Sequence, residues 1–154
     1  MATRVSAWIA AVFSLALLPA LLPAQADTKD PTDVLGSWSF QTKPYRQGQC
    51  LMTGTMRLSP HPEDGLYECE LTAVEVCSMW GRSVVEQSCQ ARRFGNQVSV
   101  RSEISQMLEQ KVEGLIYVPD NFSLTIQDHT RMWGALVSAA TAPVEFRRSE
   151  DGVS

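Results

Sequence analysis

The four cysteines, Cys50, Cys69, Cys77 and Cys89, are the residues in this sequence with the clearest chemistry. Thiols bind metal ions, exchange electrons or form disulfides. Zinc and redox sites usually place two cysteines in a Cys-x-x-Cys step, and no two of these cysteines stand in such a step. We therefore expect two structural disulfides, with no metal site and no cofactor.

The N-terminus predicts a compartment in which disulfides form. Arg4 precedes an almost purely apolar run over residues 7–22, and an Ala-Gln-Ala site follows. This order is typical of a secretory signal peptide, so we expect residues 1–26 to be removed and the protein to be periplasmic or secreted. The alternative is a membrane anchor, but Pro19 and Pro23 interrupt the run. We expect no membrane span after signal cleavage.

Alternation of apolar and polar residues predicts strands along most of the remaining chain. The predicted strands cover residues 35–41, 50–59, 66–77, 83–93, 97–104, 115–118, 121–127, 131–138 and 142–148. Consecutive hairpins favour an antiparallel up-and-down barrel of about eight strands over a sandwich, because closure removes exposed edges. We expect one mainly β domain over residues 35–148, after a flexible lead-in at 27–34 and before a frayed tail at 149–154.

One segment has a different period and predicts a helix. Ile104, Met107 and Leu108 are spaced as on one face of a helix, and Gly114 stands where a C-terminal cap is expected. We expect one amphipathic helix over residues 103–113, covering an open end or edge of the sheet.

Geometry ranks the three ways of pairing the cysteines. Cys69 and Cys77 lie eight residues apart in one predicted strand, a separation of roughly 26 Å that no disulfide bridges. Cys50 and Cys77 are equidistant from the first predicted turn, and Cys69 and Cys89 from the second. Hairpin symmetry therefore favours Cys50–Cys77 with Cys69–Cys89. The remaining alternative is Cys50–Cys69 with Cys77–Cys89.

Charge and motifs exclude several classes of function. The chain has 13 basic and 17 acidic residues, a net charge of −4, and we expect no nucleic-acid partner. His61 and His129 stand in predicted turns without an obvious partner, and the sequence has no nucleophile elbow and no glycine-rich phosphate loop. We therefore name no catalytic residue and expect a protein that is not an enzyme.

The most suggestive surface feature is the predicted turn that contains Met79, Trp80 and Arg82. Exposed aromatic and arginine side chains are common in binding hot spots, so these three residues are the partner-binding candidates. In an equally weighted interpretation, Trp80 folds back and caps the mouth of the barrel.

The chain resembles the lipocalin-like (calycin) barrels in Gly36-Ser37-Trp38 at the first strand and Arg147 and Arg148 at the last. It is similar in the same way to the small periplasmic metalloprotease inhibitors of bacteria. The resemblance implies that the Trp38 indole packs across the barrel floor and that an arginine of the last strand stacks on it. The four cysteines and the predicted helix depart from the pattern, so we expect side chains to fill the barrel, such as Met52, Met56, Tyr67, Leu71, Phe122, Leu124 and Phe146.

These features predict an exported binding module of the cell envelope, protein-binding or inhibitor-like, with an envelope or extracellular protein as partner. One alternative is a carrier of a small apolar ligand inside the barrel. Others are a structural envelope protein and an enzyme of unrecognised type, which requires a titratable group with a perturbed pKa in a cleft.

Overall fold

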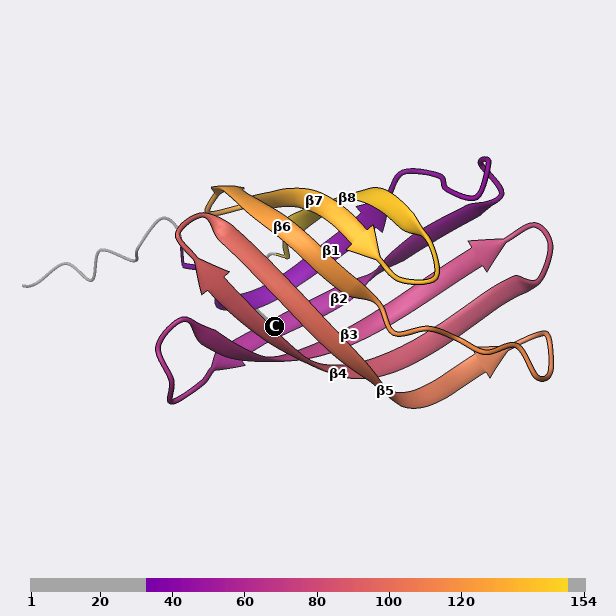
Figure 1. The fold of residues 1–154 in the computed structure, drawn as a ribbon, viewed down its shortest axis with the longest axis horizontal. Helices are drawn as coiled ribbons and strands as arrows, with labels where there is room; N and C mark the ends of the chain where they lie inside the picture. Colours follow the sequence, from indigo (N-terminus) through magenta and orange to yellow (C-terminus); the bar gives the residue numbers. More distant parts are fainter. Residues whose placement is uncertain (1–32, 150–154) are drawn as a thin grey trace, which may run out of the picture.

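The chain folds into a closed barrel of eight antiparallel strands, each paired with its neighbours in sequence order (Figure 1). The computed structural model describes residues 33–149, so the predicted signal peptide, most of the lead-in and all but the first residue of the tail lie outside the described residues. The strands are β1 (Gly36–Thr42), β2 (Cys50–Pro60), β3 (Leu66–Cys77), β4 (Gly81–Phe94), β5 (Gln97–Gln110), β6 (Asn121–Asp128), β7 (Arg131–Val137) and β8 (Thr141–Arg148).

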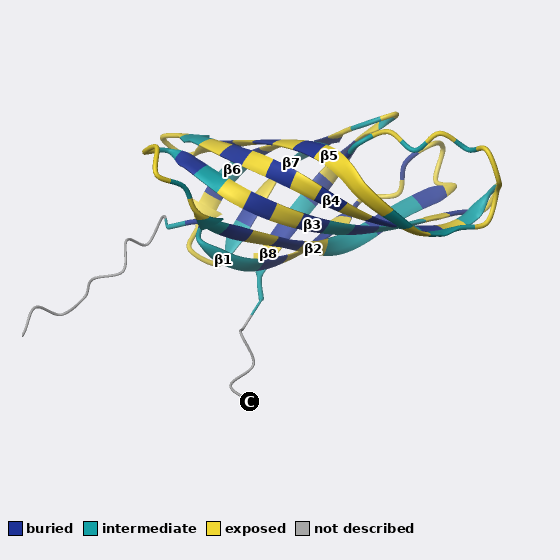
Figure 2. Cartoon of the chain, turned by 90° about the horizontal axis from the view of Figure 1, so that it is seen from below, coloured by how far each residue is buried: buried dark blue, intermediate teal, exposed yellow. Residues whose placement is uncertain are grey.

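Side chains fill the inside of the barrel. Buried and exposed residues alternate along the strands, as the checkered colouring of Figure 2 shows, because successive side chains of a strand point to opposite faces. Phe40, Phe122 and Phe146 form a cluster of mutually contacting rings with centroids 4.9–5.3 Å apart. Of the side chains expected to fill the barrel, Tyr67 is partly buried and packs against the core, and the rest are buried.

The predicted helix over residues 103–113 is wrong, because most of this segment belongs to β5. β5 pairs with β4, and the register shifts twice where Ser105 and Leu108 have no opposing residue. Each extra residue shifts by one position which side chains of the strand face the same side. Ile104, Met107 and Leu108 are therefore spaced as on one face of a helix although they belong to a strand. Within residues 33–149, no helix is long and apolar enough to cross a bilayer.

One end of the barrel, the floor, is closed by Trp38 and Arg148. The Arg148 guanidinium carbon lies 4.4 Å from the centroid of the Trp38 ring, and the Trp38 indole donates to the carbonyl of Val34 at 2.9 Å. Arg148 also donates to the carbonyls of Leu35, of Asp33 at 2.5 Å and of His129 at 2.6 Å. Its neighbour Arg147, the other arginine named from the sequence, is exposed on the outer face.

Two disulfides staple β2, β3 and β4 together. Cys50 is bonded to Cys77 and Cys69 to Cys89, which is the pairing favoured by hairpin symmetry. The cysteines of each pair stand opposite one another in the strand register. Closing loops of 27 and 20 residues stabilises the fold by about 3 kcal/mol per bridge in the loop-entropy view. A carboxylate oxygen of Glu75 lies within 4.8 Å of both sulfurs of Cys50–Cys77, but a disulfide offers no thiolate to a metal.

The opposite end of the barrel, the mouth, lies at the right of Figure 1. Four connections meet there, formed by residues 43–49, 78–80, 111–120 and 138–140. β5 pairs with β6 only over its first four residues. The rest of β5 pairs with β4 alone, and the connection 111–120 leads back from its end to β6. The predicted strand at 115–118 is therefore wrong, because the whole of it lies in this irregular connection.

Candidate functional site

A pocket of about 210 Å³ lies at the mouth, between chain segments that are distant in sequence. We call it the mouth pocket. The connections that close the mouth provide most of its walls, and β2, β3 and β7 provide the rest. Its charged, polar and aromatic lining residues are Tyr45, Arg46, Glu75, Trp80, Tyr117, Asp120 and Ser138.

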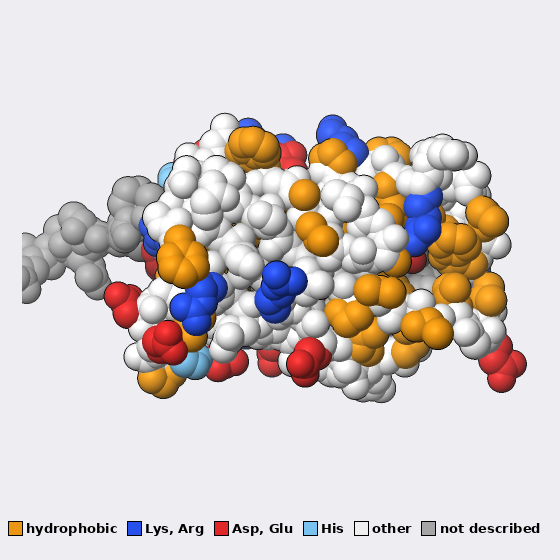
Figure 3. All heavy atoms as spheres, in the orientation of Figure 1, with side chains coloured by type: hydrophobic (Ala, Val, Ile, Leu, Met, Phe, Trp, Pro, Cys, Tyr) orange, Lys and Arg blue, Asp and Glu red, His pale blue; other side chains and the backbone are white. Residues whose placement is uncertain are grey.

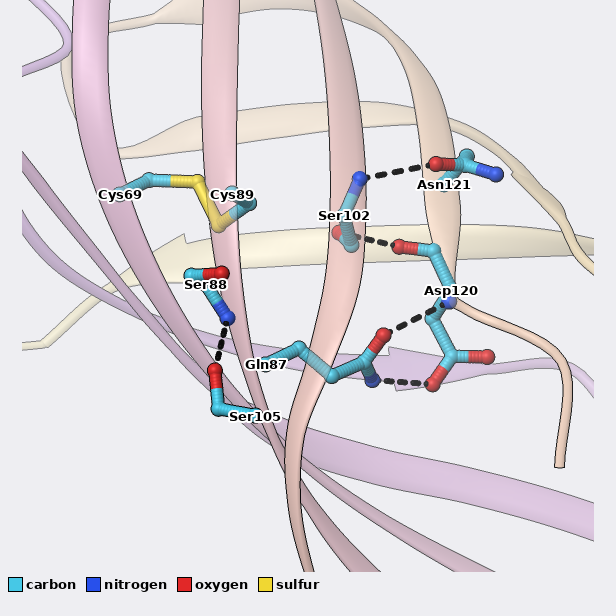
Figure 4. Close-up of a disulfide and its surroundings, with 8 residues drawn as sticks. All are labelled: Cys69, Gln87, Ser88, Cys89, Ser102, Ser105, Asp120 and Asn121. Carbon is cyan, nitrogen blue, oxygen red and sulfur yellow. Dashed lines mark hydrogen bonds between the residues drawn. A yellow bond between two sulfur atoms is a disulfide. The ribbon is translucent and has the colours of Figure 1, made fainter.

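Asp120, which directly precedes β6, is fully buried at the mouth pocket (0% exposed). The Gln87 amide of β4 donates to Asp120 Oδ2 at 2.7 Å and accepts from the Asp120 backbone N–H at 2.9 Å (Figure 4). The Tyr117 hydroxyl donates to the same Oδ2 at 2.8 Å, and the Ser102 hydroxyl of β5 donates to the Asp120 carbonyl at 2.7 Å. These bonds hold the irregular segment across the gap between β5 and β6.

Burial raises the pKa of Asp120 from 3.8 to about 6, because an apolar environment disfavours the charged carboxylate. Hydrogen bonds from Gln87 and Tyr117 oppose this shift, and the nearby Glu75 carboxylate adds to it. The side chain therefore changes charge close to neutral pH.

A second carboxylate, Glu75 on β3, faces the same pocket and accepts a hydrogen bond from the Tyr45 hydroxyl. Desolvation raises the pKa values of Tyr45 and Tyr117 far above their usual range, and the adjacent carboxylates reinforce the effect. Both phenols therefore remain protonated and serve as hydrogen-bond donors to the acids.

Two buried polar atoms at the mouth pocket have no hydrogen-bond partner among the described residues. They are Asp120 Oδ1 and Trp80 Nε1. Ser138 does not satisfy Oδ1, since its one hydroxyl hydrogen is donated to the carbonyl of Val118 at 3.0 Å. Buried polar groups are nearly always paired, so an unpaired acceptor and an unpaired donor in residues that line one pocket make the mouth pocket a candidate binding site.

The structure separates the three residues predicted to bind a partner. Trp80 packs against the core at the mouth, with the Arg46 guanidinium 5.3 Å from the centroid of its ring. Met79 next to it is 70% exposed. Arg82 forms an ion pair with Glu109 of β5, and it is not among the residues that line the mouth pocket.

Exposed apolar side chains surround the mouth, and Figure 3 shows them gathered at that end of the molecule. We call this set the rim, and its members are Val76, Met79, Leu108, Val112, Ile116, Val118 and Val137. Contiguous exposed apolar surface of this kind is typical of an interaction site.

Sequence reasoning missed the buried polar residues at the mouth. Gln87 carried a usable signal, since it shares the inward phase of its strand with Val85 and Cys89 and is therefore a polar side chain directed into the core. Asp120 carried none, because it lies in a segment without periodicity between β5 and β6.

A larger hollow of about 860 Å³ lies on the outer face of β1, β2, β7 and β8. Its floor includes Gly54 and Gly134, where a Cβ atom would lie 2.1 Å and 2.0 Å from a backbone oxygen of the neighbouring strand. Trp133 is 55% exposed beside it, and Arg131 and Arg147 both pair with Glu145 at 3.0 Å. Among its charged lining residues only Lys43 forms no ion pair within residues 33–149, and none of its lining residues has a buried polar side-chain atom without a partner, so the mouth is the stronger candidate site.

Comparison with known proteins gives one likeness in overall shape. No protein-family model matches the chain, and no curated protein matches it. One solved structure, a de novo designed fluorescence-activating β-barrel, is similar with a TM-score of 0.49 and 18% sequence identity. The match covers 75% of this chain and 93% of the designed chain.

Proposed function

We propose that this protein binds a small molecule in the mouth pocket. The observation that carries the proposal is the pair of buried, unpaired polar atoms, Asp120 Oδ1 and Trp80 Nε1, in two residues that line the same pocket. An unsatisfied buried polar group costs about 1–3 kcal/mol. A ligand that pairs with these atoms removes that cost, and part of its affinity comes from doing so.

The size and place of the pocket support a ligand larger than water. Water occupies about 30 Å³ in the liquid, and the pocket measures about 210 Å³. The aromatic cluster of Phe40, Phe122 and Phe146 fills the barrel below it. The ligand therefore binds at the mouth, in contrast to the apolar carrier we considered from the sequence, which would hold its ligand inside the barrel.

Binding is better supported than catalysis at this site. Asp120 is a buried acid with a raised pKa, which is the feature expected of an enzyme in a cleft. However, the hydroxyls of Tyr45, Tyr117 and Ser138 all donate their hydrogens to carboxylates or to a backbone carbonyl. The raised pKa values of the two phenols oppose formation of a nucleophilic phenolate.

A blocking substitution tests the proposal. Ala140 lines the mouth pocket and is partly buried, so Ala140→Phe is expected to fill the pocket. Cationic, neutral and anionic small molecules are screened by ligand-observed NMR. We expect binding to the unmodified protein and to Thr141→Phe, an exposed control at the start of β8, and at least tenfold weaker binding to Ala140→Phe. Equal binding to both variants, or no binding by any compound, would contradict the proposal.

Protein binding at the rim is the second candidate, and the exposure of Met79 favours it. Met79→Ser removes exposed apolar surface and leaves the lining of the mouth pocket unchanged. If a protein partner docks on the rim, its association with Met79→Ser should weaken at least fivefold in a surface-binding assay, with small-molecule binding preserved. If Met79→Ser weakened small-molecule binding but left the association with the protein partner unchanged, the rim would not be a docking surface.

We further propose that the protein works outside the cytosol. The two disulfides are compatible with an oxidising compartment, and the signal-peptide pattern of the N-terminus supports export. We also propose that the barrel is lipocalin-like, and the stacking of Arg148 on Trp38 at the floor supports this. The cell envelope is the location we favour.

A further inference from the structure

The mouth pocket presents hydrogen-bond acceptors, and the three hydroxyl groups of its lining already donate within the protein. The Tyr45 hydroxyl donates to Glu75, the Tyr117 hydroxyl to Asp120, and the Ser138 hydroxyl to a backbone carbonyl. Because each hydroxyl has a single hydrogen, these groups have none left for a ligand. Asp120 Oδ1, by contrast, is buried and accepts no hydrogen bond within the described residues.

The two carboxylates of the pocket have no ion-pair partner among the described residues. Neither Glu75 nor Asp120 forms an ion pair with any Lys, Arg or His of residues 33–149. Arg46 also lines the pocket, but its guanidinium lies over the Trp80 ring, 5.3 Å from the ring centroid, and pairs with neither carboxylate. Asp120 is fully buried and Glu75 half-buried, and buried carboxylates are normally paired with a cation, so a bound cation would supply the partner that they lack.

The aromatic walls fit the same kind of ligand. Trp80, Tyr45 and Tyr117 line the pocket, and the faces of such rings attract cations. The indole Nε1–H is the one unpaired buried donor in the described chain, so it can bind an acceptor elsewhere on the ligand. Acids, aromatic faces and a single donor together favour a small cation that carries N–H groups.

We infer that the ligand of the mouth pocket is a small organic ammonium compound, whose N–H groups donate to Asp120 Oδ1 and whose charge is balanced by Asp120 and Glu75. This inference rests on the proposed function and specifies its ligand class. A neutral or anionic ligand would leave the two carboxylates without an ion-pair partner.

The affinity should depend on pH in a defined direction. The charged or titratable groups that face Asp120 are Glu75, Tyr117 and Tyr45, with Arg46 next to Tyr45. Since Asp120 takes up a proton as the pH falls through about 6, its carboxylate is lost there, while an alkylammonium keeps its charge. Binding of an ammonium should therefore be strong at pH 8 and weaken as the pH drops to 5.

The test compares three probes of similar size, n-butylammonium, n-butanol and n-butyrate, by NMR titration of the oxidised protein. At pH 8 we expect n-butylammonium to bind at least tenfold more tightly than the alcohol and the carboxylate, and to lose at least fivefold in affinity at pH 5. Asp120→Asn and Glu75→Gln should each weaken ammonium binding at least fivefold. Glu86→Gln, which changes an exposed carboxylate on the outer face of β4, should leave it unchanged.

The outcomes separate this inference from the proposed function. Binding of n-butanol or n-butyrate at the mouth without binding of n-butylammonium would overturn the ammonium class and keep the pocket as a binding site. Ammonium binding that Asp120→Asn and Glu75→Gln leave unchanged would also overturn it. The Ala140→Phe comparison, which uses compounds of every charge, decides the proposed function independently.

Discussion

Replacing Asp120 with Asn is expected to stabilise the protein at pH 8 by about 3 kcal/mol and to leave its stability at pH 4 nearly unchanged. Folding raises the pKa of this carboxyl from 3.8 to about 6, so the folded protein binds the proton more tightly than the unfolded chain. A group of this kind supports stability below pH 4, and that support is lost as the pH rises through 6. A shift of about two pKa units corresponds to about 3 kcal/mol, and a neutral amide avoids the loss.

Urea denaturation of both proteins at pH 4 and pH 8 measures the effect. Asparagine keeps an oxygen for the bonds from Gln87 and Tyr117, so the variant should retain the native fold. Glu86→Gln is the matched control, because Glu86 is exposed, and we expect its stability to stay within about 0.5 kcal/mol of the parent at both pH values. A destabilised Asp120→Asn protein at pH 8 would contradict the interpretation.

This prediction bears on why the carboxyl is present. An ionised side chain that is fully buried at neutral pH weakens the fold, and substitutions that remove such strain commonly stabilise a protein at the expense of its function. If Asp120→Asn raises the stability of the protein and weakens ammonium binding, Asp120 is a functional residue. A purely structural role predicts that both properties fall together.

Replacing Arg148 with Ala is expected to lower the free energy of unfolding by about 3 kcal/mol or more. Its guanidinium donates to three backbone carbonyls and covers the Trp38 ring at the floor. The bonds to Leu35 and Asp33 are partly buried and the bond to His129 is exposed, so water recovers part of the ~1–3 kcal/mol that an unpaired buried group costs. The cation–π contact adds on the order of 1 kcal/mol.

The adjacent Arg147 is an unusually close control for this experiment. Its side chain pairs with Glu145 on the outer face, where both side chains are well exposed. Exposed ion pairs contribute about 0–1 kcal/mol, so Arg147→Ala should shift the urea midpoint only slightly. Equal losses for Arg147→Ala and Arg148→Ala would show that the floor contact does not determine stability.

The strands could be predicted from the sequence because each of them has one face in the core. Alternation placed seven of the eight strands within two residues of their observed bounds, ended β5 six residues early and predicted a strand at 115–118 that does not form. It also put Cys69 and Cys77 in one strand, which excludes a bridge between them. Hairpin symmetry then ranked the two remaining pairings. The same rule failed in the second half of β5, where Ser105 and Leu108 break the register and the strand is exposed on both faces.

The candidate site was far less predictable. The sequence pointed to the turn at Trp80, whose ring packs against the core at the mouth while Met79 is exposed, and partner binding by this turn stays a prediction. The pairing of Asp120 with Gln87 joins residues 33 positions apart through a segment of irregular backbone. Periodicity carries no information about such a segment, so only the folded structure brings these residues together.

The order of the strands has a consequence for how the barrel forms. Both disulfides join neighbouring strands of consecutive hairpins, β2–β3 and β3–β4, which assemble from contacts that are local in sequence. Closure requires β1 to meet β8, with contacts between residues 108 positions apart. Distant pairings of this kind are slow to form. We therefore expect the cysteines to oxidise before the sheet closes. The pairing of β1 with β8 is then the rate-limiting step in forming the barrel.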